Sequence, residues 1–442
     1  MNYTFKDKYL LTASIRWDGS SVLAAGNKWE SFPSAAFAWK LDQENFLKDS
    51  KVVSALKPRI SYGFTGNSNV PTYTTLSGLD KQLYYNFGTT TANGFVPATL
   101  ANKELTWEKT REVNFGLDFG FFNNRISGTI DVYDRLSKDL LFTQRLPLET
   151  GWETIYANVG SVSNKGVEVG LTTKNIVSEN VTWSTTFVFS KNTNKLESIY
   201  NQSQVSDVGN NLHLGESLNS YYNYVFDGVW QESERAEAAT FNQTPGQARV
   251  RDLNGDSVID AVNDRRVIGN SDPDWSGSVN STLTVGDFDF SFSIFTSQGV
   301  LAYSPFHENF TDLQDRGRQR LDIPNWYVPE NGAGVPAQAS NAYPMPRNEG
   351  AFWNTAGNAQ SQKMGMYRDA SFIKVKNISV GYTFNSALTE RLKIKKLRIY
   401  ANVLNPFVFT DYEGYDPEWA TAPFNTGRVS SITYQFGLSL NL

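Results

Sequence analysis

The 442-residue sequence contains no cysteine, only two histidines and no long apolar run. A chain without cysteine forms no disulfide bridge and no thiolate zinc site, and it has no cysteine nucleophile. With His213 and His307 as its only histidines, it lacks the ligands for a histidine-rich metal centre. No segment approaches the ~20 consecutive apolar residues of a transmembrane helix, and the mean hydropathy is −0.41. The sequence therefore excludes a helical membrane protein.

An excess of positive charge is also lacking. The 40 basic and 45 acidic residues give a net charge of −5, so the chain offers no broad basic surface to a phosphate backbone. We therefore expect no nucleic-acid partner. Aromatic residues, in contrast, are abundant: 11 Trp, 21 Tyr and 29 Phe make up 14% of the chain, although all hydrophobic residues together reach only 40%.

Apolar and polar residues alternate along much of the sequence. In residues 431–442 every even position is Ile, Tyr, Phe or Leu, and every odd position is polar or glycine. Residues 113–121 and 378–384 show the same alternation. A period of two places successive side chains on opposite faces of an extended backbone, so it predicts amphipathic β-strands.

The connections between these strands differ in length. Asn123-Asn124, Gly286-Asp287 and the region of Asp7 suit tight turns. Other connections are long and rich in Asn, Gly, Ser, Thr and Pro, namely 67–105, 136–158, 193–273, 298–368 and 405–429. Short turns at one end and long loops at the other are typical of outer-membrane barrels, in which a closed sheet pairs every backbone polar group. We predict an all-β, antiparallel transmembrane β-barrel.

The alternation predicts thirteen strands, at 1–5, 9–18, 30–41, 57–66, 106–121, 125–135, 159–174, 181–191, 274–285, 288–297, 369–384, 394–404 and 430–442. Single-chain bacterial barrels have even strand numbers, and residues 1–5 resemble the end of a strand that enters a turn. We therefore expect the C-terminal part of a larger barrel, with its first strand truncated. The connections 193–273 and 298–368 are expected to be extracellular loops, and residues 221–231 to add a β-segment within the first.

Several short motifs occur in a fixed order along the chain. Two examples are Phe372-Ile373-Lys374-Val375-Lys376-Asn377 and Gly414-Tyr415-Asp416-Pro417-Glu418. The other motifs lie at 8–14, 18–21, 32–34, 56–63, 65–67, 105–108, 116–118, 158–168, 227–231 and 403–407. Each motif alone is common, but their order and spacing together resemble the SusC/RagA family of TonB-linked outer-membrane proteins over the whole chain.

The resemblance implies a barrel of about 22 strands whose lumen is occluded by an N-terminal plug, with this chain supplying about thirteen strands and no plug. Members of the family import oligosaccharides, or in some cases peptides, across the Gram-negative outer membrane. A SusD-like lipoprotein covers the extracellular mouth, and energy comes from the TonB complex. The signal peptide, TonB box and plug are expected to precede residue 1. We therefore expect the 442 residues alone to be inactive and to aggregate.

One loop in the connection 193–273 has the spacing of a cation site. Hard oxygen ligands placed as in an EF-hand loop suit Ca²⁺. The candidate ligands are Asp252, Asn254, Asp256, Val258 (through its carbonyl), Asp260 and Asp264. Ser257, however, replaces the glycine expected at position 6 of the loop, and no other cofactor is indicated. The alternative is a metal-free loop held by Asx-turn hydrogen bonds. In both cases the loop is structural rather than catalytic.

A group of aromatic residues marks the connection 298–368, namely Trp326, Tyr327, Tyr343, Phe352 and Trp353. Flat rings of this kind stack on sugar faces, which makes these residues the candidate substrate-binding site. The alternatives are that they pack the loop onto its neighbours or form part of the aromatic girdle of the barrel. On the strands, Asp118, Asp131 and Glu168 are expected to line a wet lumen.

Enzymatic activity is not expected. No G-x-S-x-G elbow occurs, and both histidines lie in predicted loops. Only a glycosidase, which needs no more than a pair of carboxylates, is compatible with the composition. The main alternative to an importer is a surface β-rich carbohydrate-binding protein or adhesin, whose apolar strand faces would form a buried core. A requirement for detergent distinguishes the two.

Overall fold

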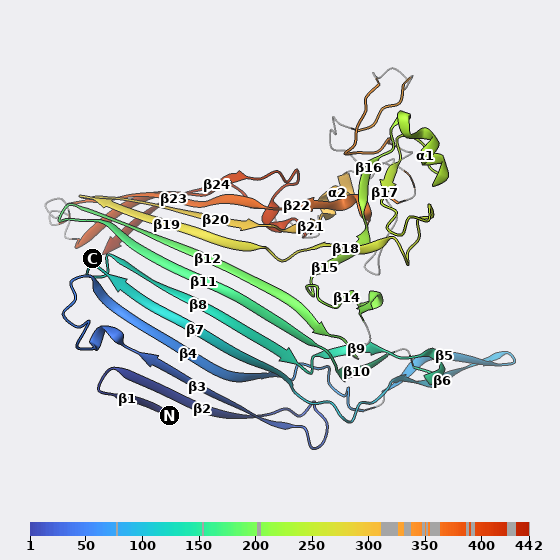
Figure 1. The fold of residues 1–442 in the computed structure, drawn as a ribbon, viewed down its shortest axis with the longest axis horizontal. Coiled ribbons are helices and arrows are strands. Elements are labelled where there is room, and N and C mark those ends of the chain that lie inside the picture. Colours follow the sequence, from blue (N-terminus) through green and yellow to red (C-terminus); the bar gives the residue numbers. More distant parts are fainter. Residues whose placement is uncertain are drawn as a thin grey trace. The chain divides into compact units, whose positions relative to one another are not determined.

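The computed structural model describes residues 1–76, 78–152, 154–200, 205–310, 326–330, 337–346, 350, 352–353, 363–385, 389, 394–421 and 430–441. The chain divides into two units: residues 1–175 with 186–206 form unit 1, and residues 176–185 with 207–442 form unit 2. Antiparallel strands dominate both, which confirms the predicted fold class (Figure 1). In the part of the chain described, no helix has the length and apolar character needed to cross a bilayer.

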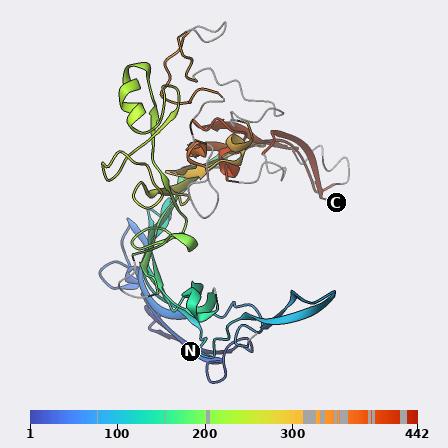
Figure 2. The same ribbon diagram turned by 90° about the vertical axis from the view of Figure 1, so that its right-hand side faces the viewer.

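Unit 1 is built on long neighbouring strands, each of which pairs with the next. They are β1 (Asn2–Phe5), β2 (Tyr9–Gly19), β3 (Trp29–Trp39), β4 (Val53–Asn67), β7 (Glu108–Phe121), β8 (Ile126–Lys138), β11 (Ser161–Val177) and β12 (Val181–Ser198), which continues from unit 2. Two hairpins lie in the long connections: β5 (Gly78–Phe87) pairs with β6 (Thr90–Thr99), and β9 (Leu141–Arg145) with β10 (Thr154–Asn158). Figure 2 shows the β5–β6 hairpin extending away from the other strands of this unit.

Unit 2 contains five further long strands, β19 (Trp275–Val285), β20 (Phe288–Gln298), β23 (Phe372–Thr383), β24 (Lys396–Phe409) and β25 (Thr433–Asn441). Its connections, where the structure describes them, form short pairs of strands and short helices. The pairs are β13 (Ser206–Asp207) with β14 (Leu212–His213), β15 (Ser220–Tyr224) with β18 (Arg265–Asn270), β16 (Phe226–Val229) with β17 (Ala248–Val250), and β21 (Leu301–Tyr303) with β22 (Tyr367–Asp369). The helices are α1 (Arg235–Thr240) and α2 (Pro305–Phe310).

The large sheet contains thirteen strands, in the order β1-β2-β3-β4-β7-β8-β11-β12-β19-β20-β23-β24-β25. All thirteen predicted strands are therefore confirmed. The additional β-segment predicted at residues 221–231 is confirmed as β15 and β16. The hairpins β5–β6 and β9–β10 were not predicted, because their sequences are rich in Asn, Gly, Thr and Gln and lack a sustained apolar alternation.

The predicted strand bounds differ from the observed ones by up to four residues, and by more at two strand ends. The strand predicted to end at residue 404 continues as β24 to Phe409, because a β-bulge places Asn405 in the left-handed region (φ 51°) and pairing then resumes. The strand predicted to end at residue 191 continues as β12 to Ser198. There the added residues are polar except for the buried Leu196, and Asn192 and Asn194 both donate hydrogen bonds to Asn164.

The long strands of unit 1 separate charged from apolar side chains. On one face, Arg59 on β4 reaches Asp118 on β7 (Nε–Oδ1 3.2 Å) and Asp131 on β8 (Nη2–Oδ2 2.6 Å). Lys57 also pairs with Asp118, at 2.6 Å. The opposite face carries Ile60, Phe115 and Val132 in successive register positions, and all three side chains are exposed. The period of two thus gives the sheet of unit 1 one ion-paired face and one exposed apolar face.

Candidate functional site

The aspartate-rich loop, residues 251–264, connects two of the short strand pairs of unit 2, β16–β17 and β15–β18. β17 pairs with β16, and β18, which follows the loop, pairs with β15. The loop therefore fixes how one strand pair continues into the other. Gly255 and Ser257 adopt left-handed backbone conformations, with φ of 77° and 63°. Ser257 thus has the conformation for which an EF-hand loop normally uses glycine at this position.

The side chains of this loop accept hydrogen bonds from its own backbone. The Asp252 carboxylate accepts from the N–H groups of Gly255 (2.7 Å) and Ser257 (2.8 Å). Desolvation raises the pKa of Asp252, but the backbone N–H groups of residues 254–257 together lower it more, so the net pKa lies below its ordinary value. Asp260 accepts from Val262 at 2.7 Å and Asn263 at 2.8 Å, and the hydrogen bonds from Asn263 lower its pKa. Both carboxylates are therefore held ionised by local donors.

Asp264 closes the loop. Its carboxylate is fully buried and accepts from the Leu253 N–H at 2.9 Å and the Asp260 N–H at 2.8 Å. Asn254 and Asp256 accept from the N–H groups of Asp256 and Val258 at 3.2 and 2.8 Å. These are the Asx-type hydrogen bonds that the sequence suggested as the alternative to a metal.

The loop carboxylates accept hydrogen bonds from backbone N–H groups and do not converge on a common ion site. Among the residues described, no three His, Asp or Glu side chains are arranged to hold a metal ion. In this conformation the candidate ligands do not fit a cation, because binding would require Asp252 and Asp256 to exchange amide donors for the ion. Calcium binding stays a prediction.

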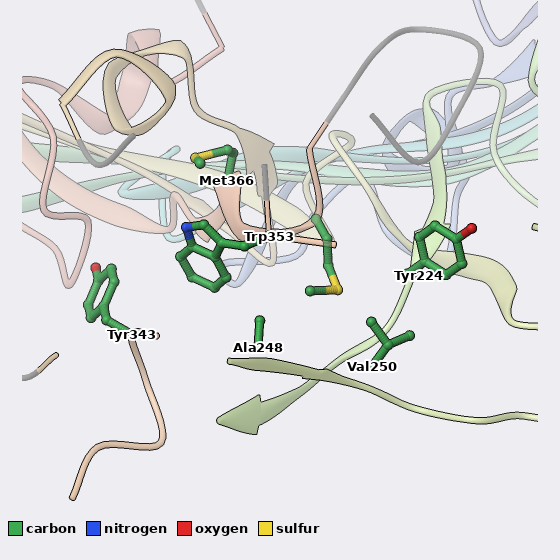
Figure 3. Close-up of a cluster of buried hydrophobic side chains, with 7 residues drawn as sticks. Tyr224, Ala248, Val250, Tyr343, Trp353 and Met366 are labelled. Atoms are coloured by element: carbon green, nitrogen blue, oxygen red, sulfur yellow. The ribbon is translucent and has the colours of Figure 1, made fainter. Parts of the chain in front are cut away.

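Four of the five aromatic candidates, all except Tyr327, belong to or pack against one buried cluster, which Figure 3 draws in part. Trp353 is 1% exposed and packs edge-on against Tyr343 (ring centroids 6.1 Å apart) and Phe226 (5.3 Å). Phe352 packs against Tyr224 at 5.1 Å. The cluster also contains Ala248, Val250, Met364 and Met366 and is contacted by Ile259 and Trp326. Residues from two connections, the one between β12 and β19 and the one between β20 and β23, thus share one small hydrophobic core.

Burial divides the five aromatic candidates. Tyr327, Tyr343 and Trp353 are buried, as packing of the loop requires, whereas Trp326 and Phe352 are half-buried. The Tyr327 N–H donates to the Tyr343 carbonyl at 2.9 Å, so the segments 326–328 and 338–343 are held together. The Tyr343 hydroxyl donates to Glu413 at 2.9 Å. Trp326 and Phe352 are therefore the rings of this group with free area for a ligand.

A buried ion cluster, which the sequence did not predict, lies where two of the family-like motifs meet. The Lys374 ammonium is fully buried and donates to Asp416 (2.8 Å), Glu418 (3.0 Å) and the Ser430 hydroxyl (2.8 Å). Lys376 also pairs with Glu418. The sequence shows the lysines in 372–377 and the acidic residues at 416 and 418. It does not show that Lys374 pairs with Asp416, because a contact between residues 42 positions apart leaves no local sequence pattern.

The histidine of α2 is equally buried. His307 Nδ1 lies 2.8 Å from the Ser304 hydroxyl, which lies 2.7 Å from the Tyr412 hydroxyl. Burial lowers the pKa of His307 to about 3, so the imidazole is neutral at ordinary pH. Ser304 and His307 have no exposed area, and a substrate carbonyl has no access to this Ser–His pair.

Comparison with known proteins relates the chain to one family. The family described as TonB dependent receptor-like, beta-barrel matches residues 1–405. The chain is 32% identical over 460 residues to the TonB-dependent receptor SusC of Bacteroides thetaiotaomicron, covering 100% of this chain and 43% of that protein. It is 31% identical over 455 residues to the TonB-dependent receptor P39 of Formosa agariphila, covering 95% and 42%. The chain thus spans less than half the length of these relatives.

Solved structures show the same fold. The structure of the RagAB peptide transporter matches with a TM-score of 0.79 at 22% identity, over 100% of this chain and 47% of that one. The RagAB peptide importer in its open-open state matches with a TM-score of 0.80 at 21% identity, over 100% and 46%. At this identity the match establishes the fold.

Proposed function

This chain belongs to the TonB-dependent receptor β-barrel family and is SusC/RagA-like, and on that premise we propose that it forms part of an outer-membrane importer of nutrient oligosaccharides. Peptides are the second candidate cargo, supported by the peptide transport named for the RagAB structures. The proposal places the chain in the outer membrane of a Gram-negative cell. Energy is proposed to come from a TonB complex.

The two-faced sheet is the observation that carries the proposal. Phe115, in the middle of β7, is 57% exposed although its neighbours across both strands are also apolar. Water does not favour such a contiguous apolar surface, whereas hydrocarbon does. The ion-paired face of the same strands suits an aqueous interior. A sheet of this kind is stable between lipid and water.

A SusD-like surface lipoprotein is the proposed partner, and the β5–β6 hairpin is its proposed contact. Tyr84, Tyr85 and Phe87 on β5 are 70%, 62% and 68% exposed. In Figure 1 the hairpin lies at the end of unit 1 opposite the tight turn between β7 and β8. Exposed aromatic side chains of this kind are the residues that dominate protein interfaces.

The partner is tested by exchanging the three β5 aromatics for serine in the full-length protein. Retention of the lipoprotein during purification is expected to fall about tenfold. Phe46→Ser is the matched control, because Phe46 is 71% exposed in the connection between β3 and β4. Unchanged retention in the triple variant would remove the hairpin from the interface.

Import is tested in cells that lack the gene and are complemented with the full-length protein. Uptake of radiolabelled neutral and acidic oligosaccharides, and of a peptide mixture, is measured with and without a protonophore. We expect energy-dependent uptake of at least one oligosaccharide in complemented cells only. Uptake restricted to peptides would show that the cargo is a peptide rather than an oligosaccharide. Equal uptake with and without the gene would contradict import.

The alternative function is that of a surface carbohydrate-binding protein or adhesin. The half-exposed rings of Trp326 and Phe352 are compatible with sugar binding in either case. An adhesin would, however, bury its apolar strand faces, and those faces are exposed in this chain. The proposed role is transport rather than catalysis, in keeping with the family.

A further inference from the structure

A cavity of about 710 Å³ lies in unit 1, among the connections that follow β2 and β4. Its walls are formed by residues 21–25, 28, 72–73, 75–76 and 103. The floor is apolar and firmly packed: Leu23 and Ala24 are 1% and 3% exposed, and Leu23 belongs to a buried cluster with Leu105 and Trp107. The Ala24 N–H also donates to the Leu105 carbonyl at 3.3 Å. The cavity is thus part of a fixed structure.

Two lysines give the cavity a local charge opposite to that of the whole chain. Among the lining residues that the structure describes, Lys28 and Lys103 are charged and none is acidic. Within the part of the chain that the structure covers, neither ammonium pairs with a carboxylate, in contrast to Lys8, Lys57 and Lys109. The sequence as a whole has a net charge of −5. An anionic group would therefore meet two cations here that have no competing partner.

Tyr73 forms the aromatic wall of the cavity in a strained conformation. Its φ is 68°, a region that bulky residues rarely adopt, and its carbonyl accepts from the Leu76 N–H at 2.8 Å. The side chain lines the cavity and is 75% exposed, so no hydrophobic packing compensates for the strain. Strained residues of this kind are enriched at ligand sites.

We propose that this cavity binds an acidic sugar unit, a uronate or a sulfated residue, of the imported oligosaccharide. Lys28 and Lys103 hold the carboxylate or sulfate, and the Tyr73 ring stacks on the sugar face. Three hydroxyl side chains in the lining, Ser21, Thr72 and Thr75, match the hydroxyl groups of a sugar better than the aliphatic parts of a peptide. The inference rests on the proposed function, because it specifies the cargo.

The test is a binding titration on the purified full-length protein in detergent, with tetragalacturonate, neutral maltotetraose and tetraglutamate as probes. The Lys28→Met/Lys103→Met double variant keeps the side-chain stems and removes both charges. We expect it to weaken tetragalacturonate binding by about 100-fold, or about tenfold per charge-assisted contact. Lys51→Met is the matched control, because Lys51 is an exposed lysine in the connection between β3 and β4, and it is expected to change nothing.

Tyr73→Ala separates the contribution of ring stacking from that of charge. Because stacking does not depend on the charge of the sugar, the variant should weaken the binding of tetragalacturonate and of maltotetraose in equal proportion. Binding of tetragalacturonate that is absent, or equal in the double variant and the wild type, overturns the site. Tetraglutamate that binds as tightly as tetragalacturonate, and loses affinity in the same double variant, overturns the assignment to a sugar. The titration needs no transport, so it holds or fails separately from uptake in cells.

Discussion

Lys374 shows what a single buried charge does in this chain. An ammonium removed from water is costly unless it is paired and hydrogen-bonded, and Lys374 has two carboxylates and a hydroxyl as partners. These partners lie in the connection that follows β24, so the charge on β23 holds that connection against the strand. The same connection also explains Lys376 on this strand, which pairs with Glu418.

Lys374→Met is therefore expected to destabilise unit 2 by about 3 kcal/mol, because it leaves Asp416 buried without its cation. The measurement is the denaturant midpoint of the full-length protein in detergent. Lys374→Met/Asp416→Leu removes both charges and should recover most of the loss. A single variant as stable as the wild type would show that solvent replaces the ammonium.

At the scale of elements, the same cluster makes the anchoring of residues 410–421 depend on pH. Burial raises the pKa of Asp416 and of Glu418, but the lysine hydrogen bonds lower both below their ordinary values of 3.8 and 4.5. A carboxylate whose pKa is lower in the folded than in the unfolded state stabilises the folded state when the pH is above the unfolded-state pKa. The contribution is therefore complete above about pH 5 and is lost as the pH falls below 4.

Hydrogen exchange checks this expectation. Amides of residues 410–421 should exchange faster at pH 3.5 than at pH 6, after correction for intrinsic rates, and the strands should change less. The Lys374→Met/Asp416→Leu variant supplies the control, since it lacks the buried charges and should show a smaller difference. Equal protection at both pH values in the wild type would contradict the role of the cluster.

The aspartate-rich loop is expected to bind Ca²⁺ weakly, with a Kd of roughly 1 mM. Its carboxylates already accept amide hydrogen bonds, which a bound ion would have to replace. Isothermal titration with Ca²⁺, and with Mg²⁺ for comparison, measures the affinity. Asp252→Asn/Asp256→Asn should abolish it, and a submicromolar Kd would show that the loop rearranges around the ion.

The sequence predicted the positions of strands wherever one face of the strand is apolar. The alternation in 113–121 and 431–442 placed β7 and β25 to within three residues. It could not show the β5–β6 hairpin or the polar end of β12, whose pairing depends on neighbours distant in the sequence. Asn405-Pro406 suggested the end of a strand, and only the bulge at Asn405 explains why β24 continues.

At the scale of the whole molecule, the exposed apolar face predicts dependence on detergent. Residues 1–442 expressed alone in aqueous buffer should sediment as aggregate, because side chains such as Phe115 and Phe292 remain exposed on the long strands. The same chain kept in detergent should remain in the supernatant. A monodisperse species without detergent would favour the adhesin.

The candidate sites show where sequence reasoning stops. It identified the aromatic residues of 298–368 and the ligands of the aspartate-rich loop, because residue types and spacing are local properties. It could not distinguish a ring that packs, such as Trp353, from one with free area, such as Trp326, since burial is decided by residues 224–250. Nor could it place Lys28, Tyr73 and Lys103 around one cavity.

The ion-paired face of unit 1 has a kinetic consequence. Lys57, Arg59, Asp118 and Asp131 carry two positive and two negative charges within one connected network. A neutral solute moving along this face meets many hydrogen-bonding groups but no net field, because each charge is compensated by its neighbour. An ionic solute likewise finds no unpaired countercharge in this network, so we expect the network itself to add little to the residence time of an ion at this face.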